Sequence, residues 1–168
     1  LRKKNVEMFR RSFRIAATFG IITSIMIIFA GDLSGVQVAK YQPSKLAAME
    51  AQWETEKGAD FYIFQIPRPE KESNIEALEI PRGLSLLAYH DPNAVVKGLS
   101  DFPKADRPPV LVTFTAFRLM VGLGFLFVLL AFISLVLAWR KKLSENRWFL
   151  WIMSFAIVLP YLASELGW

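Results

Sequence analysis

Three long apolar stretches limit what this chain of 168 residues can fold into. A bilayer core takes about 20 helical residues, so the second and third stretches can span it, and the first can if preceding residues extend it. The stretches therefore predict an all-α, polytopic helical membrane protein with three transmembrane helices and a partly helical extracytoplasmic loop. They cover residues 15–30, 110–139 and 148–168, and their only charged side chains are Arg118 and Glu165.

The distribution of charge along the chain predicts its topology. Residues 2–14 and 140–147 carry net charges of +5 and +3, whereas residues 31–109 carry −3. Cytoplasmic flanks of spans are enriched in Lys and Arg. We reject a nucleic-acid partner, because basic flanks of this kind are expected on topological grounds alone. The predicted order is a cytoplasmic basic flank and first transmembrane helix (1–30), an extracytoplasmic loop (31–109), a second transmembrane helix (110–139), a cytoplasmic loop (140–147) and a third transmembrane helix (148–168).

The sequence of the loop predicts one amphipathic helix near its start. Ser44 predicts the N-cap of a helix that runs through KLAAMEAQWETEKG to Gly58. On a helical wheel, Lys45 and Glu50 lie at the two edges of one narrow apolar stripe. Two interpretations remain open: a helix that lies on protein or lipid, or a site for a flat amphipathic ring that exchanges protons with Glu50 or Lys45. The stripe consists of Leu46, Met49 and Trp53.

The rest of the loop gives weaker signals. FYIFQIP (61–67) predicts a short extended segment, and a further apolar piece surrounds residues 84–87. His90, the single histidine of a chain without cysteine, is predicted to lie in a solvent-facing turn. With no cysteine and one histidine, disulfides, thiol catalysis and cysteine-based metal sites are excluded.

Ionisable groups at bilayer depth are costly and are functional candidates by default. Arg118 either snorkels to the outer interface or pairs with Glu165, unless one of them serves a cofactor. Glu165 follows Pro160, which predicts a kink in the third helix. Arg118, Met120 and Glu165 are all expected in the outer half of the membrane.

Several segments together resemble subunit I of cytochrome bd ubiquinol oxidase. The order and spacing agree over essentially the whole chain, and the pairing of KLAAxEAxWE with FRxM is specific. The segments are RSFRIAATFG (11–20), GD (31–32), KLAAMEAQWE (45–54), FRLMVGLGF (117–125) and LPYLASELGW (159–168).

The resemblance implies a quinol site in the loop. Lys45 and Glu50 match the residues that the family uses at this site, with catalytic roles in quinol oxidation. Asp32, at the junction of helix and loop, matches a further substrate-binding residue.

The resemblance also implies haem-binding roles within the spans. Met120 matches the axial thioether ligand of the low-spin haem b, and Arg118 matches the arginine beside that haem. Glu165 matches the carboxylate ligand at the pair of high-spin haem b and haem d, where oxygen is reduced.

The resemblance leaves parts of the subunit unmatched. The family's axial histidines lie on earlier helices, and its last helix follows residue 168, so the chain is expected to be a piece of subunit I that is inactive alone. The expected partners are quinol, oxygen, the bilayer, the remaining helices of subunit I, subunit II and small accessory subunits. The expected location is the cytoplasmic (inner) membrane of a bacterium or archaeon, with the chain crossing it several times.

The resemblance therefore implies that the chain is part of a quinol:oxygen oxidoreductase. Quinol would be oxidised at the outer loop, and electrons would pass through haems to reduce oxygen to water. The alternative is a non-catalytic, membrane-anchored protein whose outer loop binds a partner or lipid. That alternative explains the topology but not Arg118, Glu165 or the combination of motifs.

Overall fold

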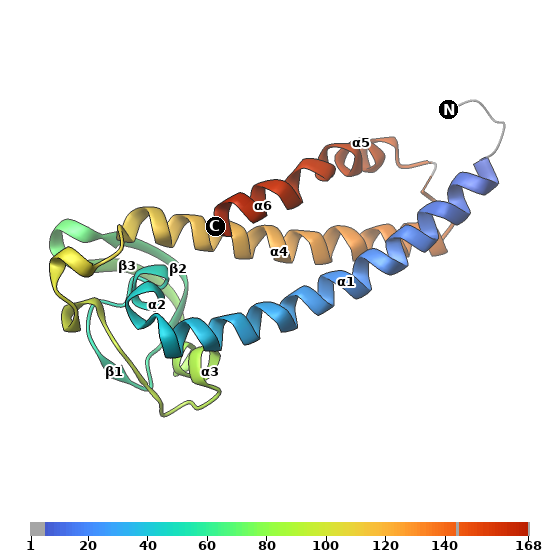
Figure 1. Ribbon diagram of the computed structural model, residues 1–168. Helices are drawn as coiled ribbons and strands as arrows, with labels where there is room; N and C mark the ends of the chain where they lie inside the picture. Colours follow the sequence, from blue (N-terminus) through green and yellow to red (C-terminus); the bar gives the residue numbers. More distant parts are fainter. Residues whose placement is uncertain (1–5, 144, 168) are drawn as a thin grey trace. The chain divides into compact units, whose positions relative to one another are not determined.

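The computed structural model describes residues 6–143 and 145–167, and within them the fold is mostly helical (Figure 1). Three helical segments in this part of the chain are long and apolar enough to cross a membrane. They confirm the prediction of a polytopic helical membrane protein. The segments are Glu7–Tyr41, Lys104–Trp139 and Arg147–Gly167.

The first two spans are longer than a bilayer requires. Helix α1 (Val6–Tyr41) has 36 residues and α4 (Val110–Trp139) has 30. At the helical rise they measure about 54 Å and 45 Å, against about 30 Å for the hydrocarbon core. Helix α1 thus continues without a break past residue 30, where the sequence predicts the loop to begin.

The third span is interrupted. It consists of α5 (Arg147–Phe155), the 3₁₀ turn η4 (Ala156–Val158) and α6 (Leu159–Gly167). Pro160 has no N–H to donate to the carbonyl of Ala156, so the regular helix cannot run through this point. The interruption lies where the sequence predicts a kink.

The chain divides into two compact units. The span unit comprises residues 1–29 and 119–168, and the loop unit comprises residues 30–118. The core of the span unit forms around the buried side chains of Leu130, Leu143 and Phe149.

The loop unit contains short helices and two small antiparallel sheets. Strands β2 and β3 form a hairpin in which Phe61 lies opposite Ile80 and Arg68 opposite Ser73. Strands β1 and β4 pair separately, with Glu56 opposite Val96. The elements are α2 (Pro43–Met49), β1 (Glu56–Lys57), β2 (Phe61–Arg68), η1 (Pro69–Lys71), β3 (Ser73–Ile80), α3 (Gly83–Tyr89), β4 (Val95–Val96), η2 (Leu99–Asp101) and η3 (Lys104–Asp106).

The prediction of a longer loop helix is wrong, because α2 is short. Its N-cap is Gln42 rather than Ser44, and it ends at Met49 rather than near Gly58. Ala51 has a left-handed backbone with φ of 50°, and the Gln52 N–H donates to the carbonyl of Ala47 at 2.8 Å. This hydrogen bond closes the helix end, as in the common helix C-terminal motifs.

The predicted apolar stripe is wrong for the same reason. Trp53 lies beyond the helix and packs against a cluster different from the one that holds Leu46. The most deeply buried side of α2 carries Ala47 and Ala48, whose small side chains let neighbouring elements pack closely against the helix. This second cluster consists of Ala47, Ala48, Ala51, Leu99, Val110 and Phe114.

The structure confirms the extended segment at 61–67, which belongs to β2. The apolar piece at 84–87 lies in α3, and His90 follows that helix with an exposed side chain, as predicted. Strand β3 was not predicted. Its sequence, SNIEALEI, is rich in helix formers, and cross-strand pairing with β2 decides its conformation.

Candidate functional site

The carboxylate of Glu50 is buried at the end of α2. Its residue is 8% exposed, and it occupies the C-cap position immediately before the left-handed turn at Ala51. An isolated buried carboxylate would be strongly destabilising, so it requires a cationic or hydrogen-bonding partner.

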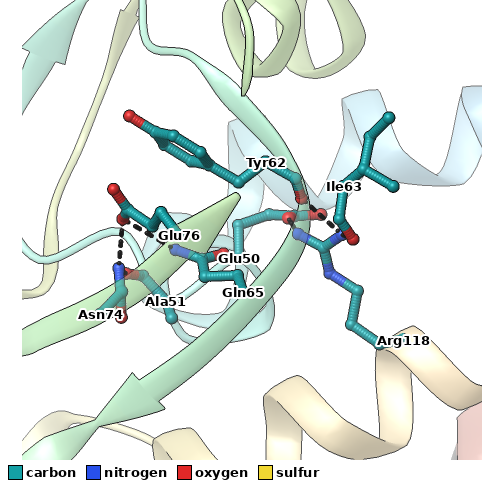
Figure 2. Close-up of polar contacts among 8 residues, drawn as sticks. All are labelled: Glu50, Ala51, Tyr62, Ile63, Gln65, Asn74, Glu76 and Arg118. Carbon is teal, nitrogen blue, oxygen red and sulfur yellow. Dashed lines mark hydrogen bonds and ion pairs between the residues drawn. The ribbon is translucent and has the colours of Figure 1, made fainter. Parts of the chain in front are cut away.

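Arg118 of α4 is that partner (Figure 2). Its Nη2 donates to Oε2 of Glu50 at 2.6 Å. Its Nη1 donates to the β2 carbonyl of Tyr62 at 2.9 Å and, more weakly, to that of Ile63 at 3.4 Å. The pair therefore joins α2, β2 and α4 at one point.

Two aromatic rings surround the guanidinium. Its central carbon lies 4.7 Å from the ring centre of Phe61 and 5.1 Å from that of Phe114. A cation in this position is attracted by the negative faces of the rings. Arg118 therefore does not snorkel to solvent, and its charge is paired with that of Glu50.

Burial raises the pKa of Glu50 to about 7, because the charged form is poorly solvated. The charge and hydrogen bond of Arg118 act in the opposite direction and only partly offset this effect. Glu50 can therefore gain or lose a proton near neutral pH while it keeps a fixed position. This property suits a general base.

One donor of Arg118 remains unused. Its Nε is buried and has no hydrogen-bond partner in the described part of the chain. A guanidinium has five N–H donors and no acceptor, so this group can serve an anionic ligand.

The other predicted loop residues lie apart from this pair. Lys45 is exposed on α2, so the structure does not bring it to the buried side with Glu50. Asp32 of α1 lies 3.1 Å from Nε2 of His90, at the end of α3, and both side chains are partly exposed. Their roles at a quinol site remain predictions.

The remaining candidates lie in the span unit. Met120 is partly buried on α4, and Glu165 is exposed on α6 without a polar partner among the residues that the structure describes. A Cβ added to Gly167 would lie 2.7 Å from the sulfur of Met120, so the two helices meet closely there. The described residues contain no group of three or more His, Asp or Glu side chains placed to hold a metal ion.

Sequence reasoning missed four contributors to the site. Phe61 and Phe114 supply rings, and Tyr62 and Ile63 supply carbonyl oxygens. The available signal was Arg118 itself, since a charge within an apolar stretch requires a partner. The identity of that partner depends on long-range contacts that local patterns do not encode.

Comparison with known proteins defines the class of this helical membrane protein. The family model for cytochrome bd terminal oxidase subunit I matches residues 1–168, so the chain belongs to that family.

Two curated relatives and one solved structure are similar over nearly the whole chain. Cytochrome bd ubiquinol oxidase subunit 1 of Bacillus subtilis (strain 168) is 34% identical, with 100% of this chain and 38% of the relative covered. Cytochrome bd-II ubiquinol oxidase subunit 1 of Escherichia coli (strain K12) is 30% identical, with 99% and 45% covered. The bd oxidase from Geobacillus thermodenitrificans matches with a TM-score of 0.84 and 34% identity, covering 99% of this chain and 38% of that one. The chain thus spans about two fifths of the length of these relatives.

Proposed function

We propose that this chain is the part of a cytochrome bd quinol:oxygen oxidoreductase that oxidises quinol, and that the loop unit holds the quinol. The observation that carries this proposal is the buried Glu50–Arg118 pair, with the pKa of Glu50 near 7. Oxidation of one quinol to a quinone releases two protons and two electrons. A carboxylate that is ionised just above neutral pH can accept one of these protons.

Each residue of the pair has a separate task. Glu50 accepts the proton from a quinol hydroxyl, and Arg118 holds the carboxylate in place while its own contacts with β2 and two aromatic rings fix the guanidinium. After the proton is released, the same ion pair forms again. Lys45 and Asp32 are proposed as further quinol contacts at the edge of the site.

The chain also carries residues that fit haem. The thioether of Met120 could supply one ligand to haem iron, and a thioether ligand would tend to raise the haem's potential. The unused Nε of Arg118 fits an anionic propionate. We assign Met120 and Arg118 to the low-spin haem b, and Glu165 to the site of the high-spin haem b and haem d. Haem held by these residues would supply one-electron redox chemistry between quinol and oxygen.

Membership of the family supports a proposal for the partners and the location of the chain. The remaining helices of subunit I, subunit II and small accessory subunits complete the oxidase in the cytoplasmic membrane of a bacterium or archaeon. Two quinols supply the four electrons that reduce one oxygen molecule to two waters, a reduction that takes up four protons.

The proposed topology places the loop unit outside and residues 140–147 in the cytoplasm. Single cysteines at the exposed positions Glu70 and Glu145 of this cysteine-free chain should react with a membrane-impermeant thiol reagent from opposite sides, Glu70 from outside. Reaction of both from one side of sealed vesicles contradicts the topology.

Replacement of Glu50 tests the proposed function. In the assembled oxidase, Glu50→Gln should lower quinol turnover on the order of 10²–10⁴-fold, because an amide cannot accept the proton. The unaltered enzyme should lose turnover as the pH falls through about 7, where Glu50 becomes protonated. Glu50→Gln should lose that dependence.

Glu54→Gln is the matched control. Glu54 is exposed and close in sequence, and its replacement should leave both turnover and the pH dependence unchanged. Full quinol turnover in Glu50→Gln, with the normal pH dependence, contradicts the proposal. The visible haem spectrum, recorded in parallel, reports whether the variants are assembled.

A further inference from the structure

The side-chain amide of Asn74, on β3, makes three hydrogen bonds, and Figure 2 shows the two that its nitrogen donates. Its oxygen accepts from the indole Nε1 of Trp53 at 2.7 Å. Its nitrogen donates to the carbonyl of Ala51 at 3.0 Å and to a carboxylate oxygen of Glu76 at 2.9 Å. These bonds connect the hairpin to the turn that follows Glu50.

The turn has a fixed place in the core of the loop unit. Trp53 packs against the cluster that includes Ala51 and Phe114, and Phe114 in turn lies against the guanidinium of Arg118. The hairpin is therefore held by several contacts. Asn74 bonds to the turn, the carbonyl of Tyr62 accepts from Arg118, and Glu72 at the tip accepts from Arg107 at 3.0 Å.

We propose that Asn74 is a positioning residue that keeps Glu50 buried by fastening the β2–β3 hairpin to the turn after α2. This inference rests on the proposed role of Glu50 in quinol oxidation. Asn74 acts through the hairpin and does not contact the carboxylate itself. Without it, the attachment of the hairpin to the turn beside Glu50 is lost, and water gains access to the pair.

The effect of hydration on the pKa of Glu50 depends on the charged and titratable groups around it. From α4 it faces Arg118, and on its own helix Lys45 points to solvent. On the hairpin, Glu76 is engaged by Asn74 and by Gln65, at 2.9 and 3.3 Å. The pKa of Tyr62 is raised to about 12 by burial and by surrounding carboxylates, so that phenol stays neutral at the pH values of interest. The pKa of Glu50 itself lies near 7.

The test uses Asn74→Leu in the assembled oxidase, with Asn93→Leu at an exposed loop position as the control. Renewed hydration of Glu50 should move its pKa back toward the ordinary value. The pH of half-maximal quinol turnover should therefore fall by about one unit in Asn74→Leu, since desolvation is the main cause of the raised value. The control should not shift.

Trp53→Phe provides a second variant. It keeps an aromatic ring and removes the indole N–H that donates to Asn74. It should shift the pH dependence in the same direction by a smaller amount, and it keeps the inference testable if Asn74→Leu does not assemble. Suppose that Glu50→Gln abolishes the pH dependence of turnover. The role of Asn74 is then overturned if the assembled Asn74 and Trp53 variants keep the same pH of half-maximal turnover as the unaltered enzyme. If Glu50→Gln retains the dependence, the proposed function itself fails, and this inference fails with it.

Discussion

Arg118→Leu should remove both the activity and much of the stability of the loop unit. Loss of one partner from a buried ion pair typically costs about 3–5 kcal/mol, because the other group must either keep an uncompensated buried charge or change its protonation state. Without the cation, the pKa of Glu50 should rise above about 7, so the carboxyl is protonated at neutral pH and cannot accept the quinol proton. Turnover at pH 7 should fall on the order of 10²-fold.

A double variant separates these two effects. Glu50→Leu combined with Arg118→Leu removes both charges, and it should recover most of the lost stability, since apolar replacements of a buried pair are often neutral or stabilising. It should not recover turnover. Arg68→Leu, at an exposed position of β2, is the control for loss of one positive charge. Thermal unfolding and quinol turnover are the measurements, and recovery of turnover in the double variant would contradict the proposed role of the pair.

Gly98→Ala should be the most destabilising small substitution in the loop unit. A Cβ at this position would overlap the carbonyl carbon of Glu54 and lie 2.5 Å from its oxygen and 2.6 Å from its Cα. These are backbone atoms, which cannot rotate away as a side chain can, so we expect a loss of about 3 kcal/mol or more. The next residue, Leu99, donates its N–H to the carbonyl of Gln52 at 2.9 Å, so the damage should extend to the turn beside Glu50.

Gly35→Ala is the matched control for Gly98→Ala. Gly35 lies on α1, and a Cβ there meets nothing within 4 Å. Alanine should stabilise the helix by about 0.5–1 kcal/mol, because glycine loses more backbone entropy. Limited proteolysis of the assembled oxidase should show rapid cleavage of the loop unit in Gly98→Ala alone. Equal resistance of both variants would contradict the close contact at Gly98.

The membrane spans could be predicted because hydropathy and length are local properties. Helix α4 covers residues 110–139, the same range as the apolar stretch, and Pro160 indicated the break in the third span. The extended segment of β2 was also predictable, since β-branched and aromatic residues dominate it.

The geometry around Glu50 was not predictable in the same way. Helix propensity favoured continuation of α2 through Trp53, whereas packing of Ala51 and its left-handed backbone end the helix at Met49. The sequence marked Glu50 and Arg118 as candidates separately. Their pairing joins residues 68 positions apart and depends on the fold of the whole loop unit.

The protonation of Glu50 is the most direct test of the proposed quinol site. Infrared difference spectroscopy of the assembled oxidase, recorded across a pH titration, detects the C=O stretch of a protonated carboxyl group. We expect a band that appears with a midpoint near pH 7 and that is absent in Glu50→Gln but present in Glu54→Gln. A spectrum without such a band, or a band that Glu50→Gln retains, would contradict the assignment of Glu50 as the proton acceptor.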